Sequence, residues 1–153
     1  MTENYVLDGV LSSDVLSIWD DVWPIAKRAV DRFTIPNKFT EDEIRAHLCN
    51  KTMQLWVVEH DEKIAAIAIT SIITNEDHFP DEKLLEVPFV AGHGMKHWLP
   101  DLYRTLKLYA LSHGCNIMVG YGRLGWKRLI GFEIVGEIDP GVIVMARRLN
   151  KDH

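Results

Sequence analysis

The feature that most constrains the fold is a strand pattern that leads through two closely spaced glycines into a long amphipathic helix. Residues 84–90 predict the strand, and Gly92 and Gly94 lie in the turn that follows it. The helix is expected to end at Gly114, because glycine is the usual residue at a helix C-cap. Strand, turn and helix in direct succession favour a layered α/β fold. The apolar face of the helix carries Leu99, Leu102, Leu106 and Ala110.

Two helices are predicted before this segment. Ser12 or Ser13 can cap the first, whose apolar positions keep a helical spacing as far as Phe33. Pro24 falls inside that helix and predicts a kink or a break there. Residues 40–43, with the sequence Thr-Glu-Asp-Glu, have the form of a capping box and predict a short second helix.

The remaining segments predict two hairpins and a further strand. Turns at residues 61–63 and 139–141 separate the first two and the last two strand patterns. The polar run 74–83, which contains Pro80, predicts a loop, and residues 124–130 predict a short helical segment. No repeat or linker divides the chain, so residues 1–153 are expected to form a single domain. The strand patterns fall at residues 54–59, 64–73, 116–121, 132–138 and 142–149.

Charge and composition exclude several classes of protein. The net charge of -5 argues against nonspecific nucleic-acid binding, since neutralising phosphates requires a basic surface. The apolar stretches are far shorter than the roughly 20 residues of a membrane helix, so we expect a cytoplasmic protein without membrane association. Cys49 and Cys115 lack a paired spacing, which indicates neither a disulfide nor a metal site.

The order of elements resembles the GNAT superfamily of N-acetyltransferases over nearly the whole chain. Residues 89–94, Phe-Val-Ala-Gly-His-Gly, lie where that family places its Gln/Arg-x-x-Gly-x-Gly/Ala loop. Residues 126–132 are similar to the short helix and Gly-Phe before the last strands of the family, whereas its first strand is limited here to residues 5–7. The resemblance implies one GNAT-like α/β domain with a central mixed, mostly antiparallel sheet flanked by helices.

A narrower resemblance concerns GNAT-like proteins encoded by tailed bacteriophages. It depends on residues 94–100, Gly-Met-Lys-His-Trp-Leu-Pro, and on residues 122–126, Gly-Arg-Leu-Gly-Trp. It implies a viral accessory or virion-associated protein, located in the host cytoplasm or in the virion.

The resemblance implies acetyl-CoA as the acyl donor. Backbone N–H groups in a glycine turn at a helix N-terminus can bind its pyrophosphate, because the helix dipole favours negative charge there. Pro100 suits a first helical position, so the helix is expected to begin near Leu99, after an irregular entry over residues 95–98. Alternatively, the two glycines only turn the chain. The implied donor-binding residues are Val87, Phe89, Val90, Ala91, Gly92, His93, Gly94, Met95, Arg123 and Trp126, with Phe89 in the slot of the usual glutamine or arginine.

Arg123 and Trp126 have two interpretations. A guanidinium beside an indole can clamp a phosphate or stack on a base. The alternative is an arginine paired with a surface carboxylate and a tryptophan packed in the core.

Acyl transfer to an amine also needs a base and a proton donor within hydrogen-bond reach. The candidate bases are Glu86 and His93, with His97 as a further candidate beside the turn. The family commonly places a tyrosine acid where this chain has Lys127, and Tyr121 can substitute for it. Solvent exposure of Glu86 and His93 and simple packing of Tyr121 are the alternatives.

Two functional hypotheses follow. The first is an acyl-CoA-dependent N-acyltransferase with a small-molecule donor and an unknown amine acceptor, which predicts an open cleft between splayed strands. The second is a GNAT-fold scaffold that has lost catalysis and serves as a phage structural or host-interaction protein. That scaffold predicts a cleft closed by Phe89, Met95 or Trp98. The oligomeric state is left open, with a homodimer as one alternative.

Overall fold

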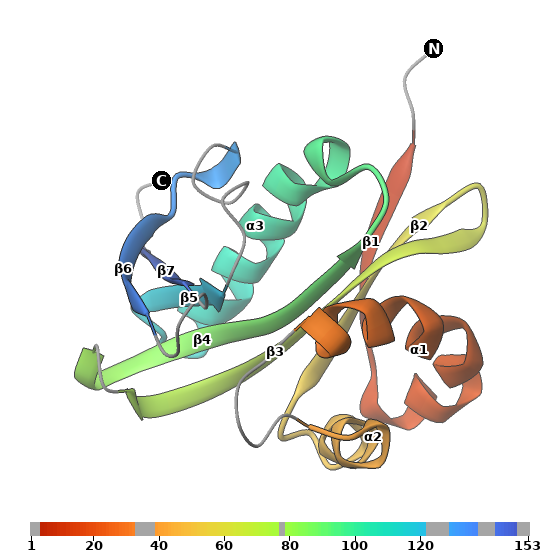
Figure 1. Ribbon diagram of the computed structural model, residues 1–153, viewed down its shortest axis with the longest axis horizontal. Helices are drawn as coiled ribbons and strands as arrows, with labels where there is room; N and C mark the ends of the chain where they lie inside the picture. Colours follow the sequence, from red (N-terminus) through yellow and green to blue (C-terminus); the bar gives the residue numbers. More distant parts are fainter. Residues whose placement is uncertain (1–3, 33–38, 77–78, 122–128, 138–142, 150–153) are drawn as a thin grey trace. The chain divides into compact units, whose positions relative to one another are not determined.

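The computed structural model describes residues 4–32, 39–76, 79–121, 129–137 and 143–149 (Figure 1). Their strands form one mixed sheet in the order β1-β2-β3-β4-β5-β7-β6. Helices flank the strands, which confirms the predicted α/β class and the mixed sheet. By its internal contacts the chain divides into two units, and each is described by itself. The first unit comprises Met1–Thr70 and Phe89–Trp98, and the second comprises Ser71–Pro88 and Leu99–His153.

An antiparallel strand set forms the sheet of the first unit. β1 (Tyr5–Val10) pairs with β2 (Gln54–His60), and β2 pairs with the first part of β3 (Lys63–Glu76). Asp61 and Glu62 adopt positive φ angles in the tight turn between β2 and β3. This hairpin confirms the prediction, and the weak pattern at residues 5–7 belongs to a full edge strand.

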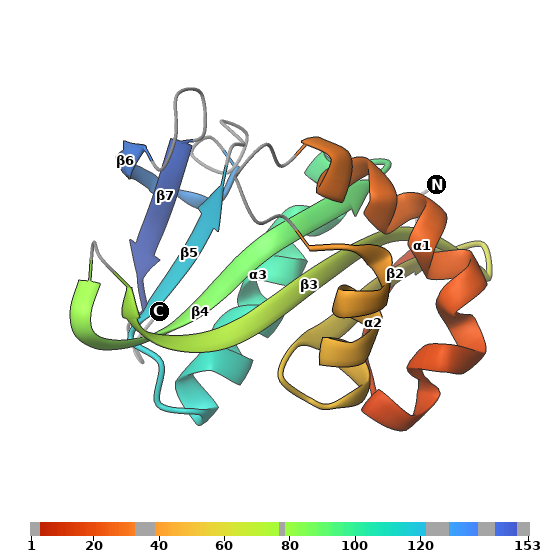
Figure 2. The ribbon, with the colours of Figure 1, turned by 60° about the horizontal axis from the view of Figure 1, so that its bottom comes forward.

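α1 (Val15–Arg32) and α2 (Glu41–Cys49) lie on one face of these strands (Figure 2). The predicted capping box is present: the Glu43 amide donates to Thr40 Oγ1 at 3.2 Å, and the Thr40 amide donates to Glu43 Oε1 at 3.0 Å. Reciprocal bonds of this kind satisfy amides that a helix start leaves without partners. Local chemistry therefore fixes where α2 begins.

α1 differs from the prediction at its start, and it continues through Pro24 without a break. The helix does not break at Pro24, and Ser12 and Ser13 do not cap it but lie in a short 3-10 turn, Ser12–Asp14. Val22 and Ala26, on either side of Pro24, are both fully buried. Packing of this continuous apolar face therefore outweighs the roughly 3 kcal/mol that an interior proline costs.

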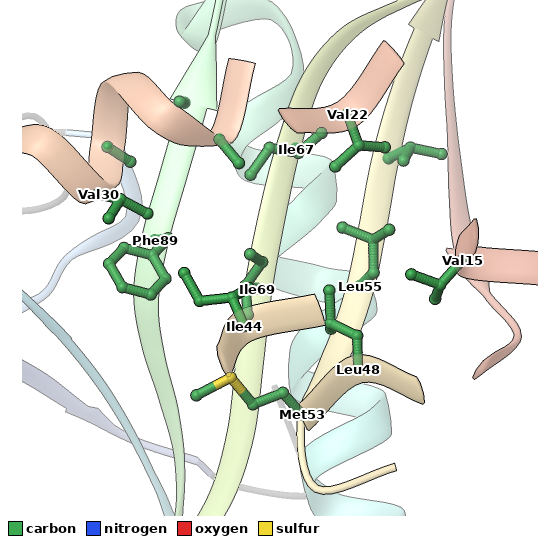
Figure 3. Packing of buried hydrophobic residues seen from close by; sticks show 14 of the residues in the cluster. Val15, Val22, Val30, Ile44, Leu48, Met53, Leu55, Ile67, Ile69 and Phe89 are labelled. Carbon is green, nitrogen blue, oxygen red and sulfur yellow. The ribbon is translucent and has the colours of Figure 1, made fainter. Parts of the chain in front are cut away.

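The core of the first unit lies between these two helices and the strands (Figure 3). Val22 and Val30 of α1 point toward the sheet, as do Ile44 and Leu48 of α2. Phe89, on β4, is completely buried in the same cluster. Each side chain of this size contributes about 1.5–3 kcal/mol when it leaves water, so the helices hold the sheet by burial rather than by polar contacts.

The second unit contains a parallel pair of strands. β4 (Phe79–Gly92) pairs in parallel with β5 (Ile117–Tyr121), and Glu86 lies opposite Val119. β7 (Ile143–Arg148) pairs antiparallel with β5 and with β6 (Glu133–Glu137), as Figure 2 shows. The strand and the final hairpin were predicted, whereas the hairpin turn at 139–141 lies outside the described residues.

The predicted loop at residues 74–83 is instead largely strand. β3 extends to Glu76 and β4 begins at Phe79. Pro80 is exposed as the second residue of β4, a position where the lack of an N–H group is tolerated. The polar side chains of this run misled the prediction, because strand residues facing solvent are polar as well.

α3 (Met95–Ser112) also begins earlier than predicted. Its first residue follows Gly94 directly, and Pro100 lies inside the helix rather than at its start. The interior proline forfeits one hydrogen bond, whereas Trp98, Leu99 and Leu102 are almost fully buried. The other end was predicted correctly, since Gly114 has a φ of +80° and its amide bonds the Leu111 carbonyl.

Several absences apply to the described part of the chain. No helix there is long and apolar enough to cross a membrane. The described side chains form no cluster of metal-binding type. Cys49 and Cys115 are free thiols, half-buried and buried respectively.

Candidate functional site

The glycine turn of the first unit has a backbone that few other residues can adopt. Gly92 has a φ of +142° and Gly94 a φ of +72°. Such angles favour glycine, because a Cβ atom would crowd the neighbouring carbonyl. His93, between them, is exposed. The turn thus ends β4 and starts α3 within three residues.

Gly92 allows β3 and β4 to approach each other closely. A Cβ atom at this position would lie 2.3 Å from Ala66 Cβ and 2.5 Å from the Ala65 carbonyl oxygen. The His93 amide donates to that same carbonyl at 3.1 Å. Gly92 is therefore required by the close approach of β4 to β3, whatever the turn binds.

Trp98 holds the backbone of the turn through a hydrogen bond. Its indole Nε1 donates to the His93 carbonyl at 2.6 Å, and the side chain is only 1% exposed. With its amide bonded to Ala65, His93 has both backbone groups occupied within the protein. Trp98 is one of the three residues that the scaffold hypothesis names, and its polar atom fixes the backbone of the turn.

Three successive amides at this turn have no acceptor in the part of the chain that the structure describes. Within the described residues, no hydrogen bond is donated by the amides of Gly94, Met95 or Lys96, whereas the His97 amide closes the first helical turn by donating to the Gly94 carbonyl at 2.8 Å. Free amides are expected at the start of any helix. Because α3 starts at Met95, they lie beside the glycines rather than several residues away.

Aromatic rings lie against one side of the turn. Tyr5 stacks between His60 and His97, with ring centroids 4.5 Å and 5.7 Å away. A Cβ atom on Gly94 would lie 2.8 Å from the Tyr5 hydroxyl. The turn is therefore bounded on this side by a tyrosine that sequence reasoning did not select.

The predicted donor-binding residues of β4 are turned into the protein. Val87, Phe89, Val90 and Ala91 are at most 6% exposed. Any contact with a ligand would therefore come from their backbone atoms. Phe89, in the slot of the polar residue in the GNAT loop, is a core residue, and its side chain meets Phe39 edge to face.

A second group of polar residues lies in the second unit. The Tyr121 hydroxyl donates to Glu86 Oε2 at 2.5 Å, and the Ser71 hydroxyl donates to Glu86 Oε1 at 3.3 Å. Both carboxylate oxygens of Glu86 are thus held while the side chain stays half-buried. Two of the predicted catalytic residues, Glu86 and Tyr121, are brought together, and neither is merely solvated or merely packed.

The environment of Tyr121 keeps its proton in place. Burial raises the pKa of Tyr121 far above its ordinary value, and the charge of Glu86, the hydrogen bond to it and the charge of Glu76 act in the same direction. The phenol is therefore a neutral donor to Glu86 at physiological pH.

The remaining candidates either show no side-chain hydrogen bond at these groups or lie outside the described residues. His93 presents an exposed imidazole at the turn of the first unit, away from any recorded side-chain partner among the described residues. Arg123, Trp126 and Lys127 lie outside the described part of the chain, so the proposed phosphate clamp stays a prediction. Ser71 was missed because a serine within an apolar strand run gives no distinct signal.

The α/β domain, with its mixed sheet flanked by helices, matches the GNAT fold of solved N-acetyltransferases. No family model and no curated protein matches the sequence. Among solved structures, FeeM, an N-acyl amino acid synthase from uncultured soil microbes, matches 99% of this chain and 93% of its own at a TM-score of 0.69 and 12% identity.

Two acetyltransferases match in the same way. PaiA N-acetyltransferase from Thermoplasma acidophilum, in complex with coenzyme A, has a TM-score of 0.62 and 11% identity over 95% of this chain and 99% of its own. A GNAT-family acetyltransferase from Listeria monocytogenes has a TM-score of 0.63 and 14% identity over 97% and 99%. At sequence identities of 11–14% these similarities show the fold of the chain alone.

Proposed function

We propose that this protein is an acyl-CoA-dependent N-acyltransferase, with acetyl-CoA as the donor and an amine as the acceptor. The observation that carries the proposal is that the amides of Gly94, Met95 and Lys96 have no acceptor among the described residues, next to a glycine turn and at the start of a long helix. Such a helix start attracts a diphosphate through its N–H groups and its dipole. Proteins of the same fold support the choice, since one is an N-acyl amino acid synthase and another was solved with coenzyme A.

The turn is suited to a diphosphate in three respects. The Trp98 bond to the His93 carbonyl fixes the backbone before any ligand binds. Gly94 carries no side chain over these amides, and the exposed Lys96 adds a positive charge. Pre-organised donors of this kind lose little entropy on binding, which strengthens each contact.

Glu86 is proposed to take the proton that the amine nitrogen releases when it attacks the thioester carbonyl. Its carboxylate is oriented by the Tyr121 and Ser71 hydroxyls, and orientation is what a general base requires. Acetyl-CoA supplies an acyl group on a thiol, whose pKa of roughly 8.5 makes the thiolate a leaving group that needs little acid assistance near neutral pH.

Tyr121 is proposed to position Glu86 rather than to act as the general acid. Its proton is bonded to a carboxylate, and burial raises the pKa of the phenol, both of which oppose donation to a departing thiolate. In this proposal Tyr121 differs from the tyrosine acid of GNAT enzymes in two respects: it lies at another position of the chain, and it orients the base instead of donating a proton.

Calorimetric titration with acetyl-CoA tests the proposal. Gly94→Ala would place a Cβ atom in the turn at a φ of +72°, and Gly114→Ala is the matched control with a similar φ of +80° at the other end of α3. Loss of one charge-assisted hydrogen bond predicts a roughly ten-fold weaker affinity for Gly94→Ala and no change for the control. Absence of binding at millimolar acetyl-CoA, or equal affinities for the two variants, contradicts the proposal.

Transfer itself is measured by following free coenzyme A chromatographically with a panel of primary amines. Glu86→Gln should abolish turnover while leaving acetyl-CoA affinity intact. Turnover unchanged by that substitution refutes the role of Glu86. The phage origin, the cytoplasmic location and a homodimer stay predictions from the sequence.

A further inference from the structure

A small pocket in the second unit uses none of the residues assigned to acyl transfer. Its volume is about 210 Å³. α3 contributes four of the lining residues and β7 contributes the fifth. Three of the five are cationic, although the chain as a whole is acidic. The lining residues are Tyr103, Arg104, Lys107, Leu108 and Arg147.

Arg147 is held in a fixed orientation. Its Nη1 donates to the Ile130 carbonyl, and its Cζ lies 4.7 Å from the centroid of the Tyr103 ring. Gly131 makes room for it, because a Cβ atom there would lie 3.3 Å from Arg147 Nη1. Among the described residues no carboxylate lies within ion-pair distance of this guanidinium. Most of its five N–H donors therefore have no recorded acceptor there.

Tyr103 adds a hydroxyl with an unmet hydrogen bond. The residue is 7% exposed, and its hydroxyl oxygen is buried without a partner among the described residues. A buried hydroxyl in that state is unfavourable, and an acceptor from a ligand would satisfy it. Burial raises the pKa of Tyr103, so the hydroxyl keeps its proton and can donate.

The other lining residues define the charge and the polarity of the pocket. Lys107 is only 6% exposed, which is rare for a lysine. Arg104 pairs with Asp101, and the nearly buried Lys107 adds its positive charge to that of Arg147. Leu108 is 70% exposed and offers an apolar surface beside these cations.

We propose that this pocket binds a small organic carboxylate that carries a short apolar chain. A guanidinium can bond both oxygens of a planar carboxylate in a bidentate manner, and Arg147 keeps N–H donors without an acceptor among the described residues. Lys107 supplies a second positive charge and the Tyr103 hydroxyl a further donor. The Tyr103 ring and Leu108 contact the apolar chain of the ligand. An inorganic anion would leave this apolar surface of the pocket exposed to water.

The test is a titration of the full chain with hexanoate, acetate and inorganic phosphate, followed by backbone amide shifts. Hexanoate is expected to bind about ten-fold more tightly than acetate, because its additional methylene groups contact the apolar surface. Binding of phosphate at least as tight as that of hexanoate, or no shift with any of the three at millimolar concentration, overturns the proposal.

Two variants locate the site. Lys107→Met keeps the length of the side chain and removes its charge, and Tyr103→Phe removes only the hydroxyl. Each is expected to weaken hexanoate binding, by about ten-fold for the charge and several-fold for the hydroxyl. Lys27→Met, at a lysine on α1 with a 57% exposed side chain, is the control and should bind as the wild type does.

Circular dichroism establishes that each variant is folded before its affinity is compared. If Lys107→Met does not fold, Tyr103→Phe decides the matter, since it preserves the packing of the ring. Hexanoate affinity unchanged in a folded Tyr103→Phe variant, or reduced equally in Lys27→Met, refutes the assignment.

Discussion

Replacing Gly92 by alanine should destabilise the protein far more than an ordinary glycine replacement. The new Cβ would meet Ala66 Cβ at 2.3 Å and the Ala65 carbonyl oxygen at 2.5 Å, at a φ of +142°. The backbone strain costs about 1–2 kcal/mol and overpacking against a strand a further 1–3 kcal/mol, so we expect a loss of roughly 2–5 kcal/mol. A loss of this size is a large fraction of the stability of a small domain.

Gly114→Ala separates the two terms, because Gly114 has a φ of +80° but the nearest atom to an added Cβ is 3.9 Å away. It should cost only the strain term of about 1–2 kcal/mol. Urea denaturation followed by tryptophan fluorescence gives the free energy of unfolding of each variant. Equal losses for the two substitutions would refute the argument that β3 requires a glycine at position 92.

Three further perturbations test other contacts. Trp98→Phe removes the bond to the His93 carbonyl and should lower the free energy of unfolding by about 1–2 kcal/mol, with weaker acetyl-CoA binding by calorimetry; a variant unchanged in both rejects the role of this bond. Burial and Glu86 raise the pKa of Tyr121, so the folded chain keeps a proton that the unfolded chain releases above pH 10. Stability should therefore fall as pH rises beyond about 10, by at most about 1.4 kcal/mol per pH unit from this group, and less steeply in Tyr121→Phe; identical pH profiles contradict this. Thr40→Ala should cost about 1 kcal/mol in the same denaturation assay, while Thr40→Ser should be nearly neutral; equal losses would exclude the capping role.

Elements set by local chemistry were predictable from the sequence. The capping box of Thr40 and Glu43 and the C-cap of Gly114 depend only on neighbouring residues. The start of α3 was misjudged because the local cost of Pro100 is outweighed by the burial of distant partners, which no short sequence window contains. Burial likewise carries α1 through Pro24 without a break. The same holds for the polar strand ends between residues 74 and 83.

The candidate site was predictable as a set of residues but not as an arrangement. Glu86 and Tyr121 meet because β4 and β5 pair in parallel with Glu86 opposite Val119. Tyr121 lies two residues after Val119 on β5, so both side chains are on the same face of the sheet. The register of a parallel pair is absent from the sequence pattern. The Trp98 bond to the His93 carbonyl also requires that α3 begins at Met95. Pro100 led the sequence analysis to place that start near Leu99 instead.

The most direct test of the central claim is an amide chemical-shift titration of the protein with coenzyme A. The account predicts that the amides of Gly94, Met95 and Lys96 shift first and most, since these three have no acceptor among the described residues. The His93 and His97 amides, already bonded to carbonyls, should shift less. Binding of coenzyme A without shifts at residues 94–96, or no binding at millimolar concentration, would contradict the claim that this turn holds the diphosphate.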